Sequence, residues 1–131
     1  MPLNSETFEH FQMKQHAFIV THSDLATFTA GPVHPVCSTF ALAREAEWAG
    51  RLFILDIKSE AEEGIGTFLE IRHKGPAFEG DRVTIVAEYE SVENGELIVA
   101  FRALAGERLI AEGKTGQRLL SIEKIATIFK R

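Results

Sequence analysis

The sequence has little of three features that mark other classes of protein. Its one cysteine, Cys37, excludes an internal disulfide framework. It has no run of lysine or arginine, and a net charge of −5 gives no basic footprint for nucleic acid. No stretch approaches the ~18 consecutive apolar residues of a membrane span, and the opening MPLNSETFEHF lacks the apolar run of a signal peptide. We therefore expect a cytoplasmic protein that binds neither nucleic acid nor membranes.

Motifs for metals and for common cofactors are also missing. His10, His16, His22 and His34 show no paired spacing and have no cysteine partners, so we expect no metal site. The glycine-rich dinucleotide fingerprint, the P-loop and the Gly-x-Ser-x-Gly elbow do not occur. Dinucleotide binding, nucleotide hydrolysis and α/β-hydrolase chemistry lack their sequence basis, and we expect no cofactor.

The sequence does have the apolar residues for one core. A chain of 131 residues with 45% apolar residues predicts a single domain, 1–131, that needs no metal or disulfide. The β-forming run at 17–21 predicts a first strand. Dense turn signals at 23–36, including two prolines, predict a shaped loop with one helical turn at most.

One substantial helix is expected in the first half. Residues 37–51 are rich in alanine, leucine, glutamate and arginine and contain no proline, and Ser38 or Thr39 would cap the helix. Gly50 is a natural place for it to end. Residues 54–66 hold an acidic patch and two glycines, which predict an exposed connection.

The second half predicts an antiparallel meander of four long strands. Branched and aromatic residues alternate in them, and they cover 66–74, 82–92, 96–104 and 108–122. Asn94-Gly95 predicts a tight hairpin turn, because both residues tolerate positive φ, and Gly106 suits a second one.

One helix and one such sheet predict an α+β domain in which the helix lies along one face of the sheet. One helix cannot cover both faces. The uncovered face or edge favours a homodimer, and a further pairing into tetramers stays open.

Glu47 and His73 are the first candidates for proton transfer. On a helix Glu47 shares a side with Phe40 and Ala43, and this partly apolar setting suits a base. A solvated glutamate paired with a nearby arginine is the alternative. His73 comes at the end of a predicted strand, before a glycine-proline turn, where catalytic groups are often presented. Taken alone, a histidine at such a place is more often a surface residue, or one whose ring nitrogens are satisfied within the fold, than a catalytic one.

Three more residues are ambiguous. Thr39 stands at the helix start, where a hydroxyl either caps the backbone or, with a base beside it, acts as a nucleophile. Gly66 could let a ligand carbonyl approach backbone N–H groups, or could simply make a turn. Cys37 is most simply an apolar filler.

Taken in order, these residues resemble a known pattern, that of the hot-dog thioesterases of the fluoroacetyl-CoA thioesterase type. The family's helix motif has a threonine eight residues before a glutamate, as Thr39 and Glu47 stand in TFALAREAEW. Its next strand carries Gly-Thr, the catalytic histidine and a glycine seven positions later, matched by Gly66-Thr67, His73 and Gly80.

Later segments continue the resemblance, which spans about Val20 to Ile122. RVTIVAEYESVENGELIVAFRAL resembles the following strands, and Ile-Ala-x-Gly with a later arginine is matched by residues 110–113 and Arg118. Two departures stand out. Phe40 replaces the small residue that usually follows the threonine, and one extra residue separates Gly113 from Arg118.

The resemblance implies a fold, a function and a site. It implies a hot-dog fold, an antiparallel sheet wrapped around one central helix, and hydrolysis of a small acyl-CoA thioester to free acid and CoA. It assigns Thr39, Glu47 and His73 to catalysis at a dimer interface, and Gly66 to the substrate carbonyl. The fold also serves non-catalytic acyl-CoA binding and acyl-CoA hydratase or dehydratase chemistry, which are the alternatives.

Overall fold

The computed structural model describes residues 2–10 and 12–130. Its elements in chain order are β1 (Met13–Ile19), the 3₁₀ turn η1 (His22–Asp24), β2 (Leu25–Phe28), β3 (Gly31–Cys37), α1 (Thr39–Leu55), β4 (Glu62–His73), β5 (Arg82–Glu93), β6 (Glu96–Ala105), β7 (Arg108–Ser121) and α2 (Ile122–Ile128).

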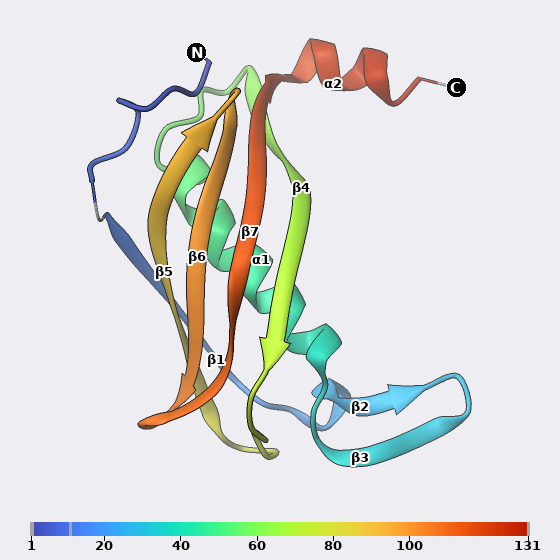
Figure 1. The fold of residues 1–131 in the computed structure, drawn as a ribbon. Helices are drawn as coiled ribbons and strands as arrows, with labels where there is room; N and C mark the ends of the chain where they lie inside the picture. The colour runs from blue at the N-terminus through green and yellow to red at the C-terminus, as the bar shows by residue number, and fades with distance from the viewer. Residues whose placement is uncertain (1, 11, 131) are drawn as a thin grey trace.

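Five strands form one antiparallel sheet in the order β1-β5-β6-β7-β4, with α1 running across its face (Figure 1). The predicted α+β architecture, a sheet around one central helix, is confirmed. β1 and β4 are the outer strands, so each has a strand partner on one side within the described chain. β2 and β3 pair separately as a hairpin that projects from the body of the molecule.

The core lies between α1 and the sheet. Val83, Ile85, Ala87 and Tyr89 alternate along β5 and share one of its faces, and all four are buried. They pack in one cluster with the buried face of α1, which includes Leu42, Ala46, Ala49, Phe53 and Ile54. No helix in the described residues has the length and apolarity that a membrane crossing requires.

The two tight turns form where the sequence predicts them. Asn94 and Gly95 join β5 to β6 with φ angles of 52° and 77°, the positive values of a type I′ turn. Gly106 joins β6 to β7 with a φ of 62°. These turns set the register of the three central strands.

The predicted end of the helix at Gly50 is wrong, because α1 continues to Leu55. Gly50 instead lets the helix approach the sheet, since a Cβ there would lie 2.6 Å from Cγ2 of Thr115. β4 likewise begins at Glu62, inside the segment expected to be an exposed connection.

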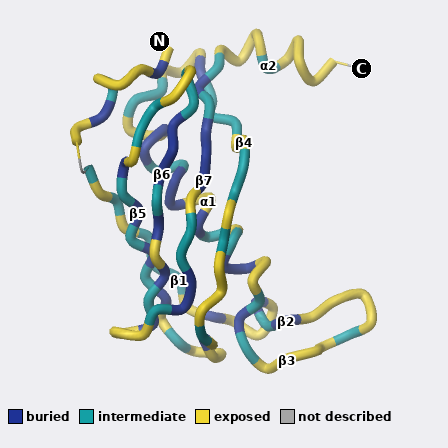
Figure 2. The backbone as a smooth tube through the Cα atoms, viewed as in Figure 1, coloured by how far each residue is buried: buried dark blue, intermediate teal, exposed yellow. Residues whose placement is uncertain are grey.

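The loop predicted for 23–36 is also wrong in part. One helical turn occurs at η1, but the remainder forms the β2–β3 hairpin. The first strand spans 13–19 rather than 17–21. Ile122 belongs to α2, which was not expected, rather than to the last strand. Much of the hairpin and nearly all of α2 are exposed (Figure 2).

Candidate functional site

Thr39 and His73 meet at the N-terminal end of α1. Ser38 is the N-cap residue, and its Oγ accepts a hydrogen bond from the N–H of Ala41 at 2.9 Å. The capping role is therefore filled by Ser38, which leaves the Thr39 hydroxyl for another partner. Thr39 Oγ1 lies 2.9 Å from Nδ1 of His73, the last residue of β4. A hydroxyl and an imidazole at this distance can exchange a proton.

This pair lines a cavity of about 900 Å³ between the β2–β3 hairpin and the start of α1. Phe28 of the hairpin and Phe40 of the helix also line it, and both side chains are largely exposed, at 64% and 78%. The volume is in the range of small-molecule sites, which are mostly apolar with a few polar groups. The cavity can accept an apolar group next to the Thr39–His73 pair.

Glu47 lies in a second cavity, of about 610 Å³, together with Gly66 and the buried Gln117. The Glu47 side chain is exposed, and in the described part of the chain its carboxylate has no hydrogen-bonding or ion-pairing partner. The nearby arginines pair elsewhere, Arg44 with Asp24 and Glu45, and Arg51 with Glu63. Glu47 is therefore a solvated glutamate that is not paired with Arg44 or Arg51.

Gly66 faces Glu47 directly, because a Cβ at residue 66 would lie 2.1 Å from Oε1 of Glu47. The β4–β7 ladder is irregular between Gly66 and Phe68, where Thr67 is an extra residue. Such bulges re-aim neighbouring groups and occur often beside active sites. Gly66 therefore combines close approach with a local change in strand direction.

Within one chain the candidates form two pairs, Thr39 with His73 and Glu47 with Gly66. Eight helical residues separate Thr39 from Glu47, about 12 Å along the axis at 1.5 Å per residue. Arg44 lies between them in sequence and lines both cavities. All four candidate residues are exposed to solvent in the single chain.

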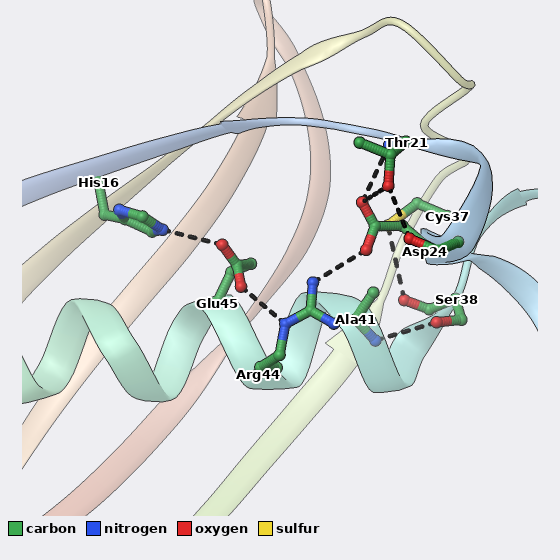
Figure 3. Close-up of polar contacts among 9 residues, drawn as sticks. His16, Thr21, Asp24, Cys37, Ser38, Ala41, Arg44 and Glu45 are labelled. Carbon is green, nitrogen blue, oxygen red and sulfur yellow. Dashed lines mark hydrogen bonds and ion pairs between the residues drawn. The ribbon is translucent and has the colours of Figure 1, made fainter.

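A charged network flanks the site (Figure 3). Arg44 donates from Nη2 to Oδ1 of Asp24 at 2.9 Å and from Nε to Oε2 of Glu45 at 2.8 Å. Glu45 Oε1 lies 3.0 Å from Nε2 of His16. Both carboxylate oxygens of Glu45 are occupied by these contacts, unlike those of Glu47.

Both carboxylates of the network remain ionised. Burial acts to raise the pKa of Asp24, but hydrogen bonds from the Thr21 backbone and from Arg44 outweigh it, and the pKa is lowered. Burial also acts to raise the pKa of Glu45. The hydrogen bonds with Arg44 and His16 outweigh this effect, so the pKa of Glu45 is lowered. By contrast, burial raises the pKa of the Cys37 thiol to about 11, which fits a buried apolar filler.

Arg118, the last residue named from the sequence, lies away from the two cavities that hold the candidate residues. Arg118 donates from Nη1 to the carbonyl oxygen of Asn94 at 2.8 Å, so it ties β7 to the β5–β6 turn. The residues that the structure describes hold no group of three or more histidine, cysteine, aspartate or glutamate side chains placed to bind a metal ion.

The sequence profile of the FlK family, fluoroacetyl-CoA-specific thioesterase, matches residues 20–123. The chain belongs to this family. A search of curated proteins gave no match.

Solved structures agree with the family and the fold. A hypothetical protein of Thermus thermophilus, described as a thioesterase superfamily member, is 34% identical over 92% of this chain and 90% of its own, with a TM-score of 0.89. The fluoroacetyl-CoA thioesterase FlK is 22% identical over 92% and 94%, with a TM-score of 0.84. A hot-dog-like protein from Thermanaerovibrio acidaminovorans is 20% identical over 97% of both chains, with a TM-score of 0.83. The predicted hot-dog fold and thioesterase family are confirmed.

Proposed function

We propose that this protein is an acyl-CoA thioesterase that hydrolyses a small acyl-CoA thioester to the free acid and CoA. The observation that carries the proposal is the 2.9 Å contact between Thr39 Oγ1 and His73 Nδ1, beside a cavity with apolar walls. Membership of the FlK family supports it. Structures of FlK mutants with acetyl-CoA, and with fluoroacetate and CoA, are among the matches and support a CoA ester as the ligand.

In the proposed mechanism His73 moves the proton. It accepts the proton of the Thr39 hydroxyl, or of a water molecule that Thr39 holds, and returns it to the CoA sulfur as the thioester bond breaks. Attack by water gives the free acid directly. Attack by Thr39 leaves the acyl group as an ester on Oγ1, which water then hydrolyses: His73 takes a proton from that water and returns one to Oγ1 as the acid leaves. Backbone N–H groups near Gly66 stabilise the negative charge that develops on the carbonyl oxygen. In comparable sites each such donor lowers the activation free energy by roughly 3 kcal/mol. Glu47 orients or activates the attacking group.

We propose a homodimer as the working form. Thr39, His73, Glu47 and Gly66 are all exposed, and two large apolar side chains beside them, Phe40 and Trp48, are 78% and 43% exposed. An exposed apolar patch at a site commonly marks an interface. A second copy would cover these side chains and exclude water from the reacting groups. The buried free Cys37 fits the cytoplasm that we propose as the location.

The first test is thiol release from a panel of short, branched and aromatic acyl-CoA esters. We expect His73→Ala to lower kcat by about 10²–10⁴-fold, because general acid–base catalysis is worth that much. His22→Ala is the matched control, since His22 pairs with Glu79 and lies outside both cavities. Its activity should equal that of the native protein.

Three outcomes contradict the proposal. Full activity in both His73→Ala and Glu47→Ala, with the fold intact, would remove these residues from the mechanism. Saturable binding of CoA esters without turnover would favour a binding module. Formation of a hydrated or dehydrated acyl-CoA, seen by product analysis, would favour hydratase or dehydratase chemistry.

A further inference from the structure

Asp24 contacts the start of α1 through both its main chain and its side chain. Its carbonyl oxygen accepts the N–H of Ser38, the N-cap residue, at 2.8 Å. Its carboxylate accepts a hydrogen bond from Arg44 at 2.9 Å, more than one turn further along α1. One residue therefore holds the helix at two points on either side of Thr39.

Asp24 is itself fixed. It is 6% exposed, and its Oδ2 accepts hydrogen bonds from the backbone N–H of Thr21 at 2.9 Å and from Oγ1 of Thr21 at 3.0 Å. Arg44 is held from its other side by Glu45, which is bonded in turn to His16 on β1. Figure 3 shows these contacts as a continuous chain from β1 across α1 to η1.

The position of Thr39 has a narrow tolerance. Its hydroxyl must lie within hydrogen-bond distance of His73, which belongs to a different element, β4. Thr39 directly follows the residue whose N–H Asp24 holds. A displacement of about 1 Å in such a pair can lower a rate by on the order of 10²-fold.

We propose that Asp24 and Arg44 are positioning residues that fix the first turn of α1, and with it the Thr39 hydroxyl, against His73. The inference rests on the proposed function where it concerns rate, and on geometry alone where it concerns the position of Thr39. Arg44 lines both cavities, but two of its N–H groups are committed to carboxylates, so it acts through the helix.

The test compares Asp24→Asn, Arg44→Met and Arg44→Lys with the native protein. We expect the first two to lower kcat for thiol release by on the order of 10–100-fold with KM changed by less than about twofold, because the reacting pair is misplaced while the cavity remains. Arg44→Lys keeps one cationic contact and should recover part of the loss. Lys14→Met is the matched control: it removes an ion pair between β1 and Asp56 at the far end of α1.

A second measurement does not depend on activity. Amide hydrogen exchange of Ser38 and Ala41, and the ¹⁵N signal of His73 Nδ1, report the helix start and the Thr39 contact directly. Both should change in Asp24→Asn and Arg44→Met and remain native in Lys14→Met. If the native protein releases no thiol, the proposed function fails, but these signals still decide the positioning role.

Three results would overturn the inference. Unchanged exchange and an unchanged His73 signal in both variants would show that the pair does not hold the helix start. Faster exchange with an unchanged kcat would show that Thr39 does not depend on it. A raised KM with an unchanged kcat in Arg44→Met would make Arg44 a substrate-binding residue instead.

Discussion

Gly66 leaves no space for a side chain beside Glu47, since a Cβ would lie 2.1 Å from Oε1. Gly66→Ala must therefore push the Glu47 carboxylate aside. We expect a fall in kcat on the order of 10–100-fold, the cost of misplacing a reacting group. The free energy of unfolding should change by less than about 1 kcal/mol, because the displaced atom ends an exposed, flexible side chain. Thiol release and urea unfolding measure the two effects.

A fully active Gly66→Ala protein would contradict the role of this contact. Loss of both activity and fold would mean that the strand, rather than Glu47, had failed to adapt. Glu47→Gln is the useful comparison, because it keeps the size of the side chain at the same place and removes its charge.

At the residue scale the sequence named the four candidates through their spacing, and the structure brings them together as two pairs. The sequence could not predict which of these candidates are in contact with each other. Thr39 and His73 are 34 positions apart, and nothing local to either one specifies that contact. The contacts of Asp24 with the start of α1 could not be predicted either, because they involve its main-chain carbonyl and an arginine 20 positions away.

At the scale of elements, Gly50 sets how closely α1 packs on β7. Thr115 is fully buried, and the added methyl of Gly50→Ala would lie 2.6 Å from its Cγ2. Alanine is favoured over glycine in a helix by about 1 kcal/mol. Overpacking costs about 1–3 kcal/mol. We expect the packing cost to prevail and Gly50→Ala to be less stable than the native protein in urea unfolding.

The double variant Gly50→Ala/Thr115→Ser is the control for this prediction, because serine has no Cγ2. The loss in free energy of unfolding should be smaller in the double variant than the sum of the losses in the two single variants. A double-mutant cycle measures this difference. A Gly50→Ala protein more stable than the native one would show that helix propensity outweighs the contact.

The central strands could be predicted because alternation and turn chemistry agree there, as at Asn94-Gly95. The β2–β3 hairpin could not. Pro32 and Pro35 indicate a loop, yet proline is tolerated in a short sheet whose strands are both edges. The end of α1 was predicted wrongly for a different reason. Gly50 allows close packing of the helix on the sheet rather than ending the helix, and a single sequence does not show which residues pack together.

On the scale of the whole molecule, the two pairs of site residues lie in separate cavities of one chain. We expect a second copy, related by a two-fold axis, to bring Glu47 of one chain to the Thr39–His73 pair of the other. Mixing inactive Glu47→Ala and His73→Ala proteins would then create one intact site in each mixed dimer. Random exchange of subunits should restore about a quarter of native activity, since about half of the dimers are mixed.

The experiment requires exchange of subunits between the two variants. An affinity tag on one variant reports the exchange, and the size of the particles shows that they remain dimers. Mixed dimers without activity would contradict a shared site and place the whole reaction within one chain. A monomer at all concentrations by sedimentation would contradict the dimer itself. Each variant alone should remain inactive, which provides the baseline.

The strand order has a consequence for the growing chain on the ribosome. β1 pairs with β5, and β4 pairs with β7, which follows every other strand of the described chain. Synthesis at ~5–20 residues per second therefore leaves α1 without a complete sheet to pack on until β5, β6 and β7 have emerged, because only these three strands connect β1 to β4. His73 gains the strand partner that holds it only when β7 arrives, because it pairs with Ala111. A nascent chain released before that point would lack both the sheet and the Thr39–His73 contact.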